Sequence, residues 1–186
     1  MLSEFLSQVK ADYSWYSKSK NPFAFILICL RHPYFQLLLL FRILSNFAQN
    51  GGGKTVLLPL YIYYKFLSWF CQIEMPITVK LGKGATFVHY GPRTFHDNAI
   101  IGEYCKFYPC ILIGGQRGKG TPIIGNHIFF ASGCKVIGKV VVGDFVFICP
   151  NSVVVKDVEP DSVISGIPAK IINKKGKENV FLYELT

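Results

Sequence analysis

Charged residues are scarce in this 186-residue chain, and acidic residues are the scarcest. Asp, Glu, Lys and Arg make up 17% of the sequence, whereas hydrophobic residues make up 51%. So little charge beside so much apolar material excludes a disordered, solvated chain. The 20 basic and 11 acidic residues leave a net charge of +9. Because the basic residues are scattered singly and no nucleic-acid-binding motif accompanies them, we expect no nucleic-acid partner.

Metal-binding and redox motifs are also missing, although the chain holds six cysteines: Cys29, Cys71, Cys105, Cys110, Cys134 and Cys149. None forms a CxxC pair or a Cys/His zinc spacing, which argues against a structural zinc site. The first twenty residues are too polar for a cleavable signal peptide. We therefore expect free thiols in a cytoplasmic protein.

The N-terminal seventy residues form a basic, apolar segment of their own. Residues 1–70 contain seven basic and two acidic residues, and three dense apolar runs occupy 23–30, 34–44 and 55–73. Residues 1–18 suit a short amphipathic helix. The run at 55–73 is nineteen residues long, close to the ~20 residues that cross a bilayer. Three alternatives stay open: helices packed on each other or across subunits, helices lying on an anionic membrane surface, or a true span. The second places the protein at the inner face of the bacterial cytoplasmic membrane.

The rest of the chain repeats with a period of six. Glycine often follows the first position of the repeat, as in Ile101-Gly102 and Val142-Gly143. An aliphatic or aromatic residue recurs at Ile124, Phe130, Val136, Val142, Ile148 and Val154. A second apolar or small residue recurs four positions later, at Ile128, Cys134, Val140, Val146, Ser152 and Val158. The same register appears upstream at Leu81, Phe87, Ile101, Phe107 and Ile113.

A period of six suits neither a helix nor a simple alternating strand. It predicts a short strand followed by a tight turn, with three hexads closing one coil and successive coils stacking ~4.8 Å apart. We expect a solenoid over 71–172, a C-terminal tail over 173–186, and the first-track residues piled in one buried column. Cys105 and Cys134 fall on the second track, which predicts a packing role for both.

The register breaks twice, and breaks in a solenoid are where function usually lies. Fourteen residues in place of twelve separate Phe87 from Ile101, and we assign the two extra residues to His96 and Asp97. Eleven residues in place of six separate Ile113 from Ile124. The sequence there, IGGQRGKGTPI, predicts a basic, glycine-rich loop that projects from the coil.

Three stretches carry a resemblance to a known family. They are IEMPITVKLGKGATFVH (73–89), the isoleucine-glycine hexads, and VVVKDVEPDSVISGIPAKII (153–172); RHPYFQLLLLFRI (31–43) resembles the family's helical lead-in. The chain resembles the serine acetyltransferase branch of the hexapeptide-repeat acyltransferases, and still more the bacterial sugar and polysaccharide O-acetyltransferases related to it. The resemblance implies a left-handed parallel β-helix behind an α-helical segment. It also implies a homotrimer with active sites between subunits and acetyl-CoA as co-substrate, without a metal.

The resemblance assigns the catalytic residues. His89 matches the family's catalytic histidine, a general base for the acceptor hydroxyl. Glu74 lies fifteen residues earlier, close to one coil, at a position where serine acetyltransferases carry aspartate. A carboxylate there orients the imidazole and stabilises the imidazolium. Without the resemblance, His89 reads as an ordinary turn histidine.

The same resemblance suggests where CoA binds. Backbone N–H groups at Gly114 and Gly115 are candidates for stabilising the oxyanion, because glycine permits close approach. The pantetheine arm is expected to run along stacked coils, and lysines are candidates for the phosphates, although each is as readily a solvated surface charge. These expected contacts are Ala131, Ser132, Pro150, Lys156 and Lys170.

The acceptor is the hardest part to assign. Serine acetyltransferases carry an Arg-His-Pro run that recognises the amino acid's carboxylate, and this chain has Gly120-Thr121-Pro122 there. Arg117 lies nearby but out of register, and His96 with Asp97 are candidate acceptor contacts. A missing anion clamp favours a neutral hydroxyl, on a sugar or a lipid-linked polysaccharide. Serine O-acetyltransferase is the alternative, and a non-catalytic β-helix scaffold is the alternative of another class.

A zinc hydratase on the same kind of β-helix needs three converging histidines. His89, His96 and His127 are separated by 7 and 31 residues, which are not multiples of an eighteen-residue coil. The spacing therefore argues against a metal site. His127 falls in a regular hexad, and we expect it to be an outward-facing scaffold residue.

Overall fold

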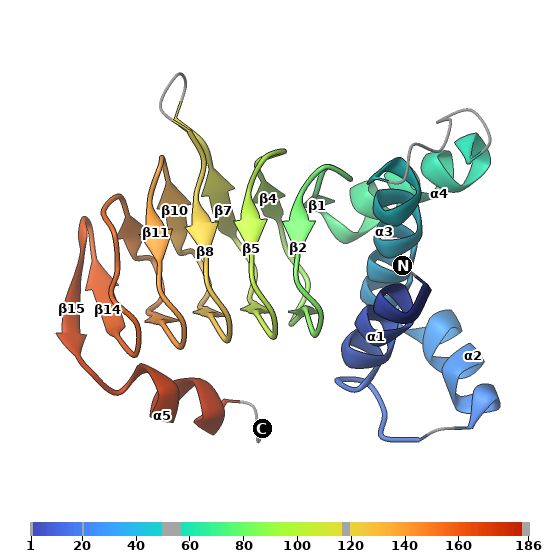
Figure 1. Ribbon diagram of the computed structural model, residues 1–186, viewed down its shortest axis with the longest axis horizontal. Coiled ribbons are helices and arrows are strands. Elements are labelled where there is room, and N and C mark those ends of the chain that lie inside the picture. Colours follow the sequence, from blue (N-terminus) through green and yellow to red (C-terminus); the bar gives the residue numbers. More distant parts are fainter. Residues whose placement is uncertain (1, 20, 50–56, 117–119, 184–186) are drawn as a thin grey trace.

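The computed structural model of the chain describes residues 2–19, 21–49, 57–116 and 120–183. In these residues, a stack of short strands extends from a group of helices at its N-terminal end (Figure 1). The helices follow the apolar runs of the sequence: α1 is Leu2–Tyr13, α2 is Pro22–Arg31, α3 is Pro33–Gln49 and α4 is Leu58–Cys71. Pro22 stands in the first turn of α2, where a missing N–H costs nothing, and Asn21 caps that helix.

The strands form three parallel faces of a β-helix. Face A contains β1 (Ile73–Glu74), β4 (Arg93–Phe95), β7 (Ile111–Gly114), β10 (Lys135–Ile137) and β13 (Val153–Val154). Face B contains β2 (Lys80–Leu81), β5 (Ile100–Ile101), β8 (Ile123–Ile124) and β11 (Val141–Val142). Face C contains β3 (Thr86–Phe87), β6 (Lys106–Phe107), β9 (Phe129–Phe130), β12 (Phe147–Ile148), β14 (Val163–Gly166) and β15 (Ala169–Asn173). The turns joining the faces stack into three columns, which we call the A–B, B–C and C–A edges.

The hexad residues fill the interior, as the period predicts. All six first-track residues from Ile124 to Val154 are at most 2% exposed, and Cys105 and Cys134 on the second track are also buried. The prediction of a single column is wrong. Each hexad occupies one face, so residues six apart lie on adjacent faces and residues a full coil apart stack. Val136 therefore stacks on Val154, and Ile124 on Val142, in separate columns around one core.

The first register break lies elsewhere than the sequence interpretation placed it. Ile73 pairs with Arg93, twenty positions later, whereas Arg93 pairs with Ile111 after a regular eighteen. Thr86 pairs with Lys106, again twenty positions later. The two extra residues therefore fall between β3 and β4, in the turn at 88–92. His96 and Asp97 lie in a regular turn, so their assignment to the expansion is wrong.

The second break is where the sequence predicts it. Leu112 pairs with Lys135, 23 positions later, so five residues are inserted between β7 and β8. Gln116 and Gly120 form an antiparallel bridge at the base of this insertion. The loop therefore leaves and re-enters the coil at the A–B edge as a paired stem.

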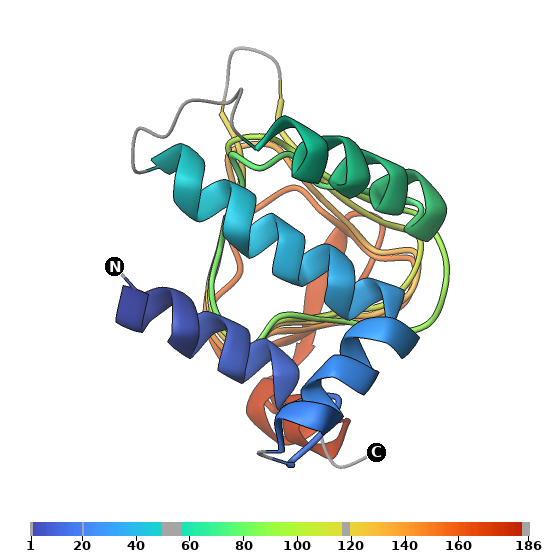
Figure 2. The same cartoon turned by 90° about the vertical axis from the view of Figure 1, so that its right-hand side faces the viewer.

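The helices cover the N-terminal end of the solenoid (Figure 2), so the first coil is not exposed to solvent there. The buried face of α3 continues the β-helix core through Leu37, Leu38 and Phe41. A buried ion pair between Arg42 and Asp12 (Nε to Oδ2, 2.9 Å) joins α3 to α1. No single helix among the described residues is long and apolar enough to cross a membrane, although α2 and α3 together pass by length and composition, with a bend of 106° between them.

The C-terminal end closes differently. β14 and β15 form an antiparallel hairpin on face C, and helix α5 (Gly176–Leu182) packs back along that face. The family-like segment SGIPAK forms the tip of this hairpin. Figure 1 shows the hairpin and α5 at the end of the stack farthest from α1–α4. The expected tail at 173–186 thus includes an ordered helix.

Candidate active site

His89 lies in the expanded turn of the C–A edge. Its backbone is left-handed, with φ of 58°, and its side chain is exposed. The imidazole contacts the ring of Tyr108 edge-on, with 5.4 Å between ring centroids. The backbone carbonyl of His89 accepts hydrogen bonds from the Tyr34 hydroxyl (3.0 Å) and from Arg93 (2.6 Å). The side chain is thus open to solvent while its backbone is held from inside.

Glu74 lies on face A, one strand below the strand that follows His89. It is exposed, and it pairs in register with Thr94. Both residues line an open groove of about 760 Å³ between face A and α4, to which Lys65, Trp69 and Gln72 also contribute. Among the described residues, Glu74 makes no hydrogen bond or ion pair with His89. One chain therefore places the two on the same coil but does not join them.

The C–A edge continues from His89 to the C-terminal hairpin. Its turns are linked by backbone hydrogen bonds, from Cys110 to Pro92 (2.7 Å), Gly133 to Pro109 (3.0 Å) and Asn151 to Ser132 (3.0 Å). These bonds stack the turns that hold three of the expected CoA contacts: Ala131, which is buried, and Ser132 and Pro150, which are exposed. The four steps from the His89 turn to the hairpin tip correspond to roughly 19 Å at ~4.8 Å per strand.

The hairpin places Lys170 at the far end of this edge. The N–H of Gly166 donates to Ser152 Oγ (3.3 Å), which fastens the hairpin tip to the C–A edge. Lys170 pairs with Ser165 across the hairpin and is exposed. The edge therefore carries the expected base at one end and a solvated cation at the other.

The remaining predicted residues lie on the opposite side of face A, at the A–B edge. His96 Nδ1 is 2.8 Å from Asp97 Oδ1, and a Cβ at Gly115 would lie 2.7 Å from His96 Nε2. A side chain at position 115 would therefore displace the imidazole from its present place. Gly114 ends β7 beside it. Within one chain, β4 separates the edge that carries His89 from the edge that carries His96, Gly114 and Gly115, so one chain does not bring these groups together.

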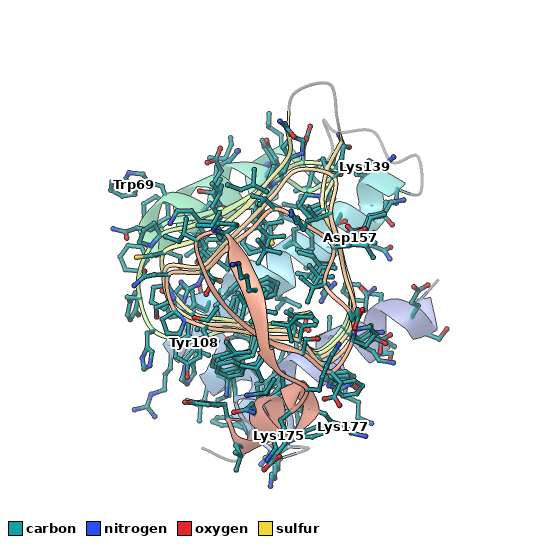
Figure 3. All side chains as sticks on the ribbon, turned by 90° about the vertical axis from the view of Figure 1, so that its left-hand side faces the viewer. Trp69, Tyr108, Lys139, Asp157, Lys175 and Lys177 are labelled. Atoms are coloured by element: carbon teal, nitrogen blue, oxygen red, sulfur yellow. The ribbon has the colours of Figure 1, made fainter. Side chains whose placement is uncertain are left out.

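Lys156 also lies at the A–B edge, after β13, and is exposed. One chain therefore does not present Lys156 and Lys170 to the same phosphate group. In Figure 3, Tyr108 marks the C–A edge on one side of the coil, while Lys139 and Asp157 mark the A–B edge on the other. Arg117, the third expected acceptor contact, lies outside the described residues.

His127 belongs to the B–C edge. Its ring stacks between Tyr104 (5.1 Å, 13° between planes) and Phe145 (4.7 Å, 7°), each one coil away. This stack is the outward scaffold role that the regular hexad predicts. Among the described residues, no group of three His, Cys, Asp or Glu side chains is arranged to hold a metal ion.

Three residues beside His89 escaped the sequence interpretation: Tyr34, Arg93 and Tyr108. Arg93 has a recognisable signal, because it falls six positions after Phe87, in the first-track register, where an arginine is rare. In the structure its side chain is buried, as is that of Phe95 two positions later. Tyr108 follows β6 just as Val88 follows β3, so coil alignment brings it near His89. Tyr34 comes from α3, and no repeat relates it to the turn.

The six cysteines are free thiols, as expected. Burial raises the pKa of Cys105 and of Cys134 to about 12, so neither is a ready nucleophile. Cys110 is exposed on the C–A edge, in the turn above His89.

Comparison with solved structures places this fold among the serine acetyltransferases. The soybean serine acetyltransferase apoenzyme matches 91% of this chain and 69% of its own with a TM-score of 0.76, at 20% identity. The Neisseria gonorrhoeae enzyme, in complex with serine, matches 92% of this chain and 69% of its own with a TM-score of 0.72, at 22% identity. The fold is accordingly a left-handed parallel β-helix preceded by helices, as the sequence resemblance implies.

Sequence comparison leads to the same group of proteins. The serine acetyltransferase of Synechococcus elongatus is 29% identical over 154 residues, which are 81% of this chain and 61% of that protein. The serine acetyltransferase of Staphylococcus aureus is 32% identical over 111 residues, 58% of this chain and 52% of that protein. The chain thus spans between half and two thirds of these curated relatives. No family model matches it.

Proposed function

We propose that this chain is an acetyl-CoA-dependent O-acetyltransferase of the hexapeptide-repeat class. The observation that carries the proposal is the C–A edge, where His89, the stacked turns and Lys170 lie in one line. An extended acyl-CoA lying along these turns would bring its thioester to His89 and its phosphates to the hairpin. In the upper turns the exposed side chains of Ser132 and Pro150 are small, which leaves room there for a pantetheine arm.

In the proposed reaction, His89 Nε2 accepts the proton of the acceptor hydroxyl as its oxygen attacks the thioester carbonyl carbon. The tetrahedral intermediate then expels the thiolate, and the imidazolium returns the proton to its sulfur. Glu74, on the same coil, is proposed to stabilise the imidazolium. No metal is required by this sequence of steps.

Two edges of face A must meet for the remaining groups to contribute. Gly114, Gly115, His96 and Asp97 lie across β4 from His89, so they reach the same acceptor only from another copy of the chain. A symmetric homotrimer, in which the C–A edge of one copy faces the A–B edge of the next, satisfies this requirement. Lys156 would then approach Lys170 of the adjoining copy.

Serine is the acceptor that the comparisons support, because the similar proteins are serine acetyltransferases and one was solved with serine. They do not support the sugar acceptor that the sequence interpretation put first. One observation keeps a sugar hydroxyl as the second candidate. The groove beside Glu74 is large for an amino acid, and Trp69, 76% exposed, offers it an aromatic surface on which a sugar ring can stack.

Release of free CoA thiol tests the function and separates the two acceptors. Serine, nucleotide sugars and lipid-linked oligosaccharides are supplied in parallel with acetyl-CoA. Acceptor-dependent release with serine supports the first candidate, and release with a glycan alone supports the second. Absence of release with every acceptor, together with no binding of acetyl-CoA, would favour a non-catalytic scaffold.

We also propose that the helical end associates with an anionic membrane surface at the inner face of the cytoplasmic membrane. Large apolar side chains on α4 face solvent, among them Ile62, Phe66 and Trp69, and α2 exposes Phe23 and Leu30. Co-sedimentation with anionic vesicles that weakens at high salt supports this location. Equal recovery with and without vesicles would return these helices to packing between copies.

A further inference from the structure

Arg93 is a buried arginine without an acidic partner among the described residues. It is 1% exposed and is the largest of the fully buried side chains. Burying a guanidinium is costly unless its donors are satisfied. The hydrogen-bond partners of Arg93 therefore indicate why an arginine is buried there.

The N–H groups of Arg93 donate mainly to carbonyl oxygens of the turn that carries His89. One terminal nitrogen donates to the carbonyl oxygens of Val88 and His89, the latter at 2.6 Å, and the other donates to Gly91 at 2.9 Å. Nε and one terminal nitrogen also reach the carbonyl of Phe107, in the next coil, at 3.3 Å. Three carbonyls of a single expanded turn thus converge on one side chain.

Tyr34 completes this arrangement from helix α3. Its hydroxyl donates to the His89 carbonyl at 3.0 Å and lies 3.4 Å from a terminal nitrogen of Arg93. The guanidinium carbon lies 5.2 Å from the Tyr34 ring centroid and 5.5 Å from that of Phe87. The carbonyl of His89 is therefore held by the β-helix and by the helical end together.

The regular turns above have no such fastening. Backbone bonds join them, from Cys110 to Pro92 and from Gly133 to Pro109, and their side-chain contacts are single ones, such as Lys135 Nζ to the Gly133 carbonyl at 3.1 Å. The 88–92 turn is two residues longer than these turns, although its left-handed residue, His89 (φ 58°), has counterparts in them at Cys110 (63°) and Asn151 (57°). The added length sets this turn apart, and a longer turn has more backbone freedom, so it needs an added constraint if its side chain is to keep one direction.

We propose that Arg93 and Tyr34 are positioning residues that fix the direction of the His89 imidazole. The proposal rests on the acyltransferase function proposed above and adds to it a requirement outside the substrate site. Neither side chain touches substrate. Both act through the His89 carbonyl, and Tyr34 makes the geometry of the base depend on the packing of α3.

Tyr34→Phe is the cleanest test, because it removes the hydroxyl and keeps the ring. We expect kcat to fall roughly 3- to 10-fold, the scale of one hydrogen bond, with KM for acetyl-CoA unchanged. Arg93→Met should lower kcat about 100-fold, as displacement of a reacting group does. Arg93→Lys, which keeps the charge and some donors, should recover part of that loss.

Trp15→Phe is the matched control. The indole Nε1 of Trp15 donates to the carbonyl of Gly84 at 2.8 Å, so it also ties the helical end to a turn of the first coil, at the B–C edge. Its loss should cost similar stability and leave kcat unchanged. Wild-type kcat in both Tyr34→Phe and Arg93→Lys, with His89→Ala inactive, would overturn the positioning role and leave the function standing.

Amide hydrogen exchange gives a second readout that needs no turnover. The proposal requires faster exchange across residues 88–92 in Tyr34→Phe than in wild type or Trp15→Phe. Unchanged exchange in that segment overturns the proposal whatever the rates show. If His89→Ala retains wild-type turnover, the proposed base is wrong, and the exchange result still decides whether Arg93 and Tyr34 order the turn.

Discussion

His89 and His127 occupy the same backbone state on two different edges of one β-helix. Both are turn residues with φ near +55°, at 58° and 55°. His127 follows the regular period and lies flat between two aromatic rings, one in each neighbouring coil. His89 lies where the period is broken, with its ring exposed and only its backbone fastened. The two histidines therefore differ in their place in the repeat and not in residue type, and the proposed site lies where the repeat is broken.

The comparison of His89 with His127 depends on the β-helix that carries both, and the largest expected effect is the loss of that fold. Val142 lies in the core at 1% exposed, while Val141 beside it points outward at 49%. Val142→Asp buries an unpaired carboxylate and should prevent folding, at a cost above ~4 kcal/mol. Val141→Asp should fold as wild type does. Circular dichroism and thermal melts show whether each variant folds. A stable Val142→Asp protein would contradict the burial of Val142 in the β-helix core.

Substitution of the two histidines tests the comparison directly. His89→Ala should lower acyl transfer by ~10²–10⁴-fold, the contribution of a general base, with acetyl-CoA binding retained. His127→Ala should leave turnover unchanged and lower stability by about 1 kcal/mol, because it removes the middle ring of a stack. Steady-state rates and melts of both proteins check this. Equal loss of turnover in the two variants would remove the distinction between the edges.

The features that could be predicted from the sequence are those that follow the six-residue repeat. The hexad residues, buried Cys105 and the scaffold role of His127 could all be predicted, because period alone decides which side chains point inward. The loop at 114–122 could be placed for the same reason. The prediction that all first-track residues share one column was wrong, because the period gives the spacing of these residues along the chain but not the number of faces over which they are distributed.

The site was predicted less completely because turn geometry and helix packing are not periodic. The count between Phe87 and Ile101 shows two extra residues but not their location, which pairing of Ile73 with Arg93 settles. Tyr34 reaches His89 from a helix 55 residues away in the chain. The separation of His89 from His96 across β4 likewise depends on which turn each occupies. Their closeness in the sequence does not reveal that the two turns are on different edges.

Protection of a thiol can sharpen the assignment of the C–A edge. Cys110 is exposed in the turn between His89 and Ser132, whereas Cys105 and Cys134 are buried with pKa values raised to about 12. Alkylation by iodoacetamide should therefore modify Cys110 and spare the two buried thiols. Saturating CoA lying along this edge should slow modification of Cys110 by about tenfold, as measured by peptide mass spectrometry. Unchanged modification with CoA bound would place the cofactor elsewhere.

The smallest expected effect concerns two lysines, Lys156 on the A–B edge and Lys170 on the C–A edge. Lys170 is exposed on a hairpin anchored to the edge that carries His89, so its loss should raise KM for acetyl-CoA roughly 2- to 5-fold, the scale of one solvated ion pair. Lys156→Ala in a monomer has no means of acting on that edge. In a trimer whose edges meet, Lys156→Ala should raise KM to a similar extent, and both increases should shrink at high salt. Kinetics of the two variants beside their oligomeric state by light scattering therefore test edge and assembly together. An effect of Lys156→Ala alone would mean that the phosphates lie at the A–B edge, and the line from His89 to the hairpin would not be the CoA path.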